Sequence, residues 1–419
     1  VLNRPIYKRI IYIIVTWSTF NLMKMKLKEL EELYKNELNN QIIPFWIDNS
    51  LDNEYGGYLT CLDDVGDVYD YDKFIWLQCR QMWMFSFLYE NQANNLNYLE
   101  VAKLGESFLT KYGHDGNYDW FFSLDRKGNP LVQPYNIFSN TFAAMAYGRL
   151  GLITGDENLI DISRKTFQRI LDREKNPKGK YNKLYPGTRP LKNFSLPMIL
   201  CNLTIELSEI IDQSISEPLI ERVTNEITEE FYSKEYGLVH ENIHENGSFS
   251  DSYDGRLINP GHSIESMWFL MEIAEKQSNT ELISKAVQIT LNTLEFGWDK
   301  KYGGIFYFLD IKNKPLQQLE WNQKLWWVHI ETLIALIKAY RLTGNKKCLE
   351  WFTIVHDYTW KNFRDSKNKG EWFGYLNRDG SRLLDLKGGK WKGCFHVPRG
   401  LYKISKILTD INATSQHAK

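Results

Sequence analysis

Apolar positions follow a helical period through most of the chain, in two alternating styles. Segments 27–38 and 282–294 repeat apolar residues every three or four positions, which is typical of helices that bury one face. Segments 74–89 and 325–339 are apolar nearly all round, as helices enclosed by other helices are. This alternation predicts two concentric layers of helices.

Glycine-aromatic turns separate the predicted helices. The clearest read Tyr55 to Tyr58 (YGGY), Tyr302 to Ile305 (YGGI) and Trp372 to Tyr375 (WFGY), each followed by an acidic or amide residue. They predict short β-hairpins at intervals of roughly 60 residues. The sequence therefore predicts an all-α protein, an (α/α)6 barrel whose loop hairpins gather at one end and form a pocket there. An open α-solenoid is the alternative, but the repeats are few, long and irregular, which favours closure.

The ends of the chain differ from its body. Arg4, Lys8 and Arg9 precede an apolar run at 10–15, as in a signal peptide, but the run is far shorter than the ~20 residues of a membrane span, and no small-residue cleavage site follows. We expect 1–22 to be an upstream extension or a disordered segment, 23–412 to be a single barrel domain, and 413–419 to be a tail.

Composition excludes several classes of function. The net charge is -1 with a pI of about 6.8, so nothing favours nucleic acid or a membrane as a partner. The five cysteines form no metal-ligand cluster, and we expect buried free thiols in a reducing compartment, which predicts a cytoplasmic protein. The 14 Trp, 24 Tyr and 22 Phe are enough to line a pocket with flat rings suited to sugars.

Two histidines stand beside prolines that favour helix starts. His262 follows Pro260, and His396 precedes Pro398. Because proline is tolerated in the first turn of a helix, both imidazoles are expected at helix entrances. The partial positive charge there disfavours protonation, so we expect both rings to be neutral bases near pH 7.

Each histidine has a charged companion three residues later, Glu265 after His262 and Arg399 after His396. This spacing places both side chains of a pair on one helical face. A pair of poised imidazoles with charged neighbours indicates proton transfer, although a single histidine at a helix start is more often a structural or surface residue.

Two charges fall on the enclosed helices. Arg80 and Glu331 have mainly aromatic and aliphatic neighbours one turn away. An unpaired buried charge is costly, so each requires a partner or a ligand. A structural ion pair and a binding role remain open for both residues.

Other chemistries are less well supported. His240 and His244 have no third ligand and are expected in a hairpin or at the surface, so no metal site is predicted. Glycoside hydrolysis is a stronger alternative, because α/α barrels suit it and acidic residues lie in predicted loops. Those residues (Asp63, Asp64, Asp251 and Asp254) stand where turns ordinarily recruit aspartate.

Five motifs, in order along the chain, resemble the N-acylglucosamine 2-epimerase family, also called renin-binding protein. They are Trp76 to Gln81 (WLQCRQ), Asn259 to His262 (NPGH), Glu320 to His329 (EWNQKLWWVH), Glu371 to Tyr375 (EWFGY) and Gly393 to Arg399 (GCFHVPR). The likeness extends from about Leu27 to Leu408. It is closer to the N-acetyl-specific branch than to the cellobiose epimerases or mannose isomerases of the same barrel.

The resemblance implies an (α/α)6 barrel that interconverts N-acetyl-D-glucosamine and N-acetyl-D-mannosamine. It implies that His262 and His396 are an acid/base pair and that Arg80 and Glu331 are also essential. The substrate-binding residues expected beside them are Glu265, Arg399, Asn202 and Trp326.

The resemblance also implies a homodimer and no consumed cofactor, with ATP or another nucleotide as an allosteric activator. The basic loop at 178–189 is the candidate nucleotide site. Another sugar epimerase or isomerase of the family, an inverting glycoside hydrolase and a non-catalytic interaction protein are the alternatives.

Overall fold

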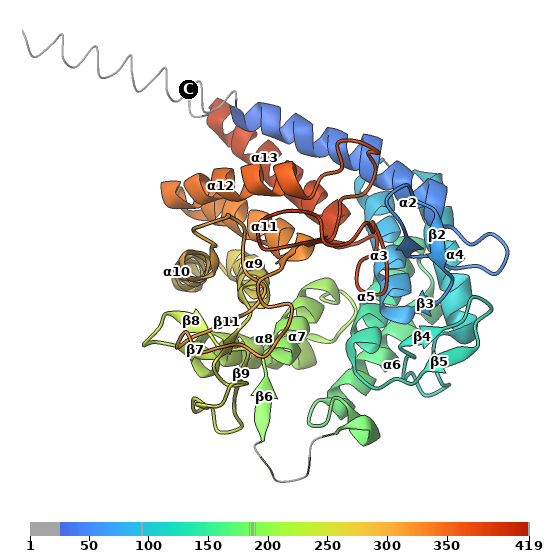
Figure 1. Cartoon of the computed structure of the whole chain (residues 1–419). Coiled ribbons are helices and arrows are strands. Elements are labelled where there is room, and N and C mark those ends of the chain that lie inside the picture. The colour runs from blue at the N-terminus through green and yellow to red at the C-terminus, as the bar shows by residue number, and fades with distance from the viewer. Residues whose placement is uncertain (1–25, 94, 184, 186–187, 189, 418–419) are drawn as a thin grey trace, which may run out of the picture.

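Six inner helices form a ring in the computed structural model, which describes residues 26–93, 95–183, 185, 188 and 190–417 (Figure 1). Their apolar surfaces pack on one another and on outer helices, which is why most of them lack a polar face, although the last keeps an exposed polar side. The inner helices are α3 (Ile75–Asn91), α5 (Phe138–Thr154), α7 (Ser195–Glu206), α9 (Pro260–Lys276), α11 (Trp326–Thr343) and α13 (His396–His417).

An outer layer covers the inner ring. Each outer helix follows an inner one and packs against it, burying only one side of its surface. These helices are α4 (Leu96–Tyr112), α6 (Glu157–Arg173), α8 (Gln213–Asn225) with the π-helical turn Glu226–Glu230, α10 (Thr280–Gly297) and α12 (Lys346–Asn362). Before α3 the chain supplies another outer segment, an α-helix at 26–37, the π-helical turn Leu38–Ile42 and α2 (Ile43–Ser50).

Contacts between the two ends of the chain close the ring. The N-terminal segment lies along α13 (Figure 1), where Glu31 accepts a hydrogen bond from Nδ2 of Asn412 at 2.7 Å. Between α3 and α13, the Phe87 and Tyr402 rings meet with centroids 4.9 Å apart. The predicted closed (α/α)6 barrel is confirmed, and the open solenoid was the wrong alternative.

Short antiparallel strands stand in the loops that lead into the inner helices. β3, β6, β10 and β12 lie within three residues before α3, α7, α9 and α11, so the strands mark the end of the barrel where inner helices begin. The pairs are β1 (Cys61–Leu62) with β2 (Val68–Asp70), β3 (Lys73–Phe74) with β4 (Ser123–Leu124) and β4 with β5 (Pro130–Val132), β6 (Leu191–Asn193) with β9 (Asn242–His244), β7 (Tyr232–Ser233) with β8 (Leu238–Val239), β10 (Leu257–Ile258) with β11 (Leu309–Asp310), and β12 (Lys324–Leu325) with β13 (Tyr375–Leu376).

A buried ion pair ties one glycine turn to the inner helix that follows it. Gly56 and Gly57 both have positive φ, and a Cβ on Gly57 would lie 2.7 Å from a side-chain oxygen of Gln78. Beside this turn Asp52 accepts from Nζ of Lys73 at 2.9 Å, and neither side chain is exposed to solvent. Such a pair fixes the turn against the start of α3.

Three further expectations concern the ends of the chain, the cysteines and membrane spans. Residues 1–22 lie outside the described residues, and α13 runs through His417, so most of 413–419 is helical. All five cysteines are buried free thiols, as expected. Within the part of the chain that the structure describes, no helix combines the length and hydropathy required to cross a membrane.

Candidate active site

A cavity of about 650 Å3 opens at the end of the barrel where the inner helices begin. Seven of the eight residues singled out from the sequence line it, namely Arg80, Asn202, His262, Glu265, Trp326, His396 and Arg399. The eighth, Glu331, is fully buried and bonds two of these residues from behind. Segments far apart in sequence therefore converge on one site.

His262 stands in the first turn of α9, as predicted. Asn259 caps this helix by accepting from the His262 backbone N–H, and Pro260 occupies the first turn. Nδ1 of His262 lies 3.1 Å from both carboxylate oxygens of Glu241. Burial lowers the pKa of His262, but the Glu241 carboxylate outweighs it and the net shift is upward. The carboxylate therefore opposes the effect of the helix end that was expected to favour the neutral ring.

His396 is the first residue of α13, and its surroundings act in the opposite direction. Its Nδ1 lies 2.7 Å from Oε1 of Glu331. Burial and the nearby cations of Arg80 and Arg399 nevertheless lower the pKa of His396 to about 3, against the opposing effect of Glu331. The neutral base expected at this helix entrance agrees with the structure.

One tryptophan joins the two histidines. The Trp327 ring lies 5.4 Å from the His262 ring and 6.0 Å from the His396 ring, centroid to centroid. Both imidazoles thus flank the same indole in the same cavity. Because Nδ1 of each ring faces a carboxylate, Nε2 is the nitrogen left for a substrate.

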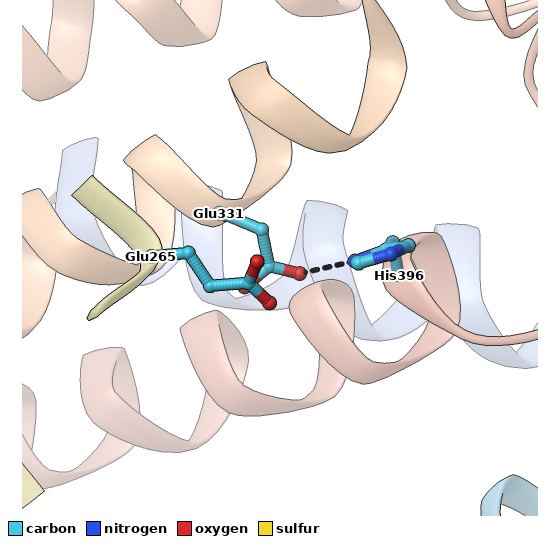
Figure 2. Close-up of side chains that lie close together, drawn as sticks. All are labelled: Glu265, Glu331 and His396. Atoms are coloured by element: carbon cyan, nitrogen blue, oxygen red, sulfur yellow. Dashed lines mark hydrogen bonds and ion pairs between the residues drawn. The ribbon is translucent and has the colours of Figure 1, made fainter. Parts of the chain in front are cut away.

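Arg399 bridges two carboxylates below the cavity. Its Nη2 donates to Oε1 of Glu331 at 2.7 Å and to Oε1 of Glu265 at 2.9 Å. Figure 2 shows the two carboxylates side by side, with Glu331 directed at His396. Burial and the Glu331 charge raise the pKa of Glu265 to about 7, whereas Arg399 and His396 overcome burial and hold the pKa of Glu331 to about 2.

The same cluster has the composition of a metal site. Ligand atoms of Glu265, Glu331 and His396 lie within 4.8 Å of one another. However, the Arg399 guanidinium already bonds both carboxylates, so it supplies the positive charge that a metal ion would bring.

Arg80 has aromatic neighbours in place of a carboxylate. Its guanidinium carbon lies 4.4 Å, 4.0 Å and 4.9 Å from the ring centroids of Trp76, Phe142 and Phe395. Among the described residues it forms no ion pair, and burial lowers its pKa to about 9. The structural ion pair left open by the sequence is therefore present for Glu331, with Arg399, and absent for Arg80 in this part of the chain. Arg80 is a desolvated cation available to a ligand.

The remaining two predicted residues also face the cavity. The Asn202 amide donates to Sδ of Met145 at 3.4 Å, a weak acceptor. Trp326 packs edge-on against Tyr375 at 5.2 Å and meets the His396 ring at 6.3 Å. Both side chains therefore keep polar or aromatic surface for a bound molecule.

Sequence reasoning missed Glu241 entirely. It stands between β8 and β9 with no periodicity or motif around it, so only its contact with His262 reveals it.

The acids of the hydrolase alternative do not line the cavity: Asp63 caps its own turn, and Asp251 pairs with Arg256. His240 packs against Phe249, away from any second ligand that the structure describes.

Comparison with known proteins agrees with this geometry. The sequence profile of the N-acylglucosamine 2-epimerase (GlcNAc 2-epimerase) family matches residues 57–397, most of the chain. The chain belongs to this family. It is accordingly an enzyme, an epimerase.

Several relatives share nearly the whole length of this epimerase. The N-acylglucosamine 2-epimerase of Bos taurus is 36% identical over 381 residues, covering 89% of this chain and 90% of its own. That of Homo sapiens is 33% identical over 376 residues, covering 88% of each. The cellobiose 2-epimerase of Dictyoglomus turgidum is 25% identical over 401 residues, covering 92% of this chain and all of its own.

Solved structures share the fold of the epimerase. The cellobiose 2-epimerase from Bacillus thermoamylovorans B4167 superposes with a TM-score of 0.78 at 22% identity, over 90% of this chain and 99% of its own. A GH76 α-mannanase of Bacteroides thetaiotaomicron gives a TM-score of 0.58 at 12% identity, over 92% of this chain and 97% of its own. The barrel thus serves more than one reaction, and the site must decide between them.

Proposed function

We propose that this epimerase interconverts N-acetyl-D-glucosamine and N-acetyl-D-mannosamine by moving a proton at C2 of the opened sugar. The observation that carries the proposal is the pair of imidazoles that both pack against one indole in the same cavity, with Arg80, which forms no ion pair among the described residues, lining that cavity. Inversion at C2 requires a proton to leave one face and another to arrive at the opposite face, a task that suits two bases on separate helices.

The reaction needs no redox step. In the open-chain sugar the C2 hydrogen is alpha to the C1 aldehyde, so one imidazole Nε2 takes the proton, the C–H electron pair forms the C1–C2 double bond, and O1 gains the negative charge. The second imidazole then donates a proton to the other face of C2, and the aldehyde re-forms. Both transfers fall within the range of imidazole acid/base chemistry.

Each further residue receives a role in this scheme. Arg80 stabilises the enolate oxygen, since a desolvated guanidinium interacts strongly with a charge that develops beside it. Glu331 orients His396 through Nδ1. Glu265, Arg399, Asn202 and Trp326 line the cavity and bind sugar hydroxyls or the acetamido group.

We favour an amino-sugar substrate over cellobiose or mannose because the chain is more similar in sequence to N-acylglucosamine 2-epimerases than to cellobiose 2-epimerases. The mammalian N-acylglucosamine 2-epimerases are 33–36% identical to this chain, whereas the cellobiose 2-epimerases are 22–25% identical. A hydrolase is disfavoured because Asp63, Asp64, Asp251 and Asp254 lie outside the cavity. The carboxylate of Glu241 bonds His262, and the buried Glu265 and Glu331 both bond Arg399.

A proton NMR time course tests the proposal. Purified protein with N-acetylmannosamine in heavy water is expected to give N-acetylglucosamine signals with deuterium at C2. Turnover of cellobiose or mannose in place of the amino sugar would contradict the substrate, and release of reducing ends from an oligosaccharide would indicate hydrolysis. Full turnover by a His262→Asn or His396→Asn variant would refute the two-base scheme.

We also propose, from the family resemblance, a cytoplasmic homodimer stimulated by ATP or another nucleotide that is not consumed. The candidate nucleotide loop at 178–189 falls partly outside the described residues. Repeating the time course with and without ATP, together with the sedimentation mass, tests the activation and the dimer.

A further inference from the structure

The carboxylates that hold the two histidines differ in their own partners. The charge of Glu331 is shared, because Arg399 donates to it at 2.7 Å and Nε1 of Trp268 donates at 2.9 Å. Glu241 receives only a long contact of 3.4 Å from the Asn193 amide in addition to His262, and in the described part of the chain it pairs with no lysine or arginine. Its negative charge is therefore directed at His262 alone.

The backbone around Glu241 is fixed between two inner helices. Its N–H donates to the carbonyl of Leu257, shortly before α9, and its carbonyl accepts from the N–H of Phe194 at the start of α7. The residue is 7% exposed. The backbone of Glu241 is therefore fixed, and its buried carboxylate lies 3.1 Å from Nδ1 of His262.

Charges from the other elements reinforce the difference between the histidines. Around His262, Glu265 adds a second negative charge from α9, and the Tyr307 phenol next to Glu241 stays neutral because burial raises its pKa. Around His396, Arg80 from α3 and Arg399 from α13 oppose protonation. The surroundings therefore shift the pKa values of the two imidazoles in opposite directions, up for His262 and down for His396.

We propose that Glu241 is a positioning residue that holds the Nδ1 hydrogen of His262, turns Nε2 toward the cavity and stabilises the protonated form of this ring. For the epimer whose C2 hydrogen faces His396, His396 is then the proton acceptor and His262 the proton donor, and the two roles are exchanged for the other epimer. This inference rests on the proposed function for its catalytic meaning, but the state of His262 is measurable without a substrate.

Two variants at Glu241 and one control variant separate an electrostatic role of Glu241 from a purely structural role. Glu241→Gln removes the charge, and Glu241→Asp keeps it at a shorter reach. Glu245→Gln removes an exposed charge directly after β9 and is the matched control. The His262 imidazole is titrated by NMR from about pH 5 to pH 9, with its signal assigned from His262→Asn. In parallel, kcat and KM for N-acetylmannosamine are measured over the same range.

Glu241→Gln is expected to lower the pKa of His262 and to move the alkaline fall of kcat/KM to lower pH. We expect kcat to drop about 10–100-fold with KM little changed, since the change alters a proton donor and not a binding contact. Glu241→Asp should recover part of both effects, and Glu245→Gln should match the parent protein.

Two outcomes would overturn the inference. One is a His262 titration that Glu241→Gln leaves unchanged, and the other is a loss of activity with an unaltered pH profile, which marks a structural role. A protein with no epimerase activity but a shifted His262 titration would refute the proposed function and leave the electrostatic role of Glu241 intact.

Discussion

Nδ1 of His396 lies 2.7 Å from Oε1 of Glu331, a residue 65 positions earlier on a different inner helix. The same oxygen accepts from Arg399, so one carboxylate both orients the imidazole and neutralises a buried guanidinium. Proton transfer and stability of the barrel core are therefore coupled at Glu331.

Changing Glu331 to glutamine should damage both properties. The amide leaves Arg399 with a single carboxylate, which we expect to cost about 3–5 kcal/mol of unfolding free energy, and kcat should fall about 10–100-fold or more as His396 loses its orientation. Urea unfolding and kcat, measured well below the melting temperature, check the two effects.

Glu272→Gln is the matched control for that variant. Glu272 is a carboxylate on α9 that pairs with Lys403 and Lys338 and has no contact with His396. The Glu272→Gln variant should have a lower unfolding free energy than the parent protein but the same kcat. Equal losses of kcat in both variants would indicate general loosening of the barrel.

Replacing Arg80 with methionine should separate activity from stability. Arg80 is buried over three rings and forms no ion pair with any residue that the structure describes, so removing its charge relieves a desolvation cost, and the melting temperature should stay equal or rise. The loss of enolate stabilisation should lower kcat about 10²–10³-fold. Calorimetry and the NMR time course measure the two effects.

Arg149→Met provides the contrast. Arg149 also lies over aromatic rings, Trp83 and Phe87, but it pairs with Glu206 at 2.9 Å. Its removal should lower the unfolding free energy by about 3 kcal/mol by leaving Glu206 uncompensated. If Arg80→Met lost as much unfolding free energy as Arg149→Met, the result would contradict the unpaired state of Arg80.

Stability should decline as pH falls below about 6.5 because buried histidines must stay neutral. Burial lowers the pKa of His329 to about 3, and its Nε2 accepts from the Ile305 N–H at 3.0 Å. Between pH 6.5 and 3 the unfolded chain binds a proton that the native state does not. At pH 5 this costs about 2 kcal/mol for His329.

His329→Gln tests that origin. Glutamine offers an amide donor and an acceptor in place of the two ring nitrogens, so the melting temperature of this variant should fall less between pH 7 and pH 5 than that of the parent. His244→Gln in β9 should follow the parent protein. Parallel curves for all three proteins would exclude His329 as a source of acid sensitivity.

Asp52→Asn should strongly destabilise the turn before α3. The substitution leaves the buried Lys73 ammonium without its carboxylate, at an expected cost of about 3–5 kcal/mol. Glu54→Gln is the matched control, because exposed Glu54 shares Arg126 with Asp52 and should change stability by less than about 1 kcal/mol. Chemical unfolding curves of the two variants should differ accordingly.

Local patterns predicted much of the fold. The all-apolar run around Arg80 identifies an inner helix, and the prolines beside His262 and His396 identify helix entrances, because proline restricts its own backbone wherever the rest of the chain lies. Of the seven predicted residues that line the cavity, the family motifs contain five, and Asn202 and Glu265 lie outside the motifs.

The sequence by itself determined which residues are enclosed and which stand at helix starts, since period and backbone restriction act within a turn or two of the chain. Only the tertiary structure decided which of these side chains are in contact with one another. Closure of the ring brings Glu331 into contact with Arg399 and His396. It also places Arg80 among aromatic rings and brings Glu241 next to His262. These contacts join segments far apart in sequence, and the protonation of each imidazole depends on the charges within a few ångströms of it.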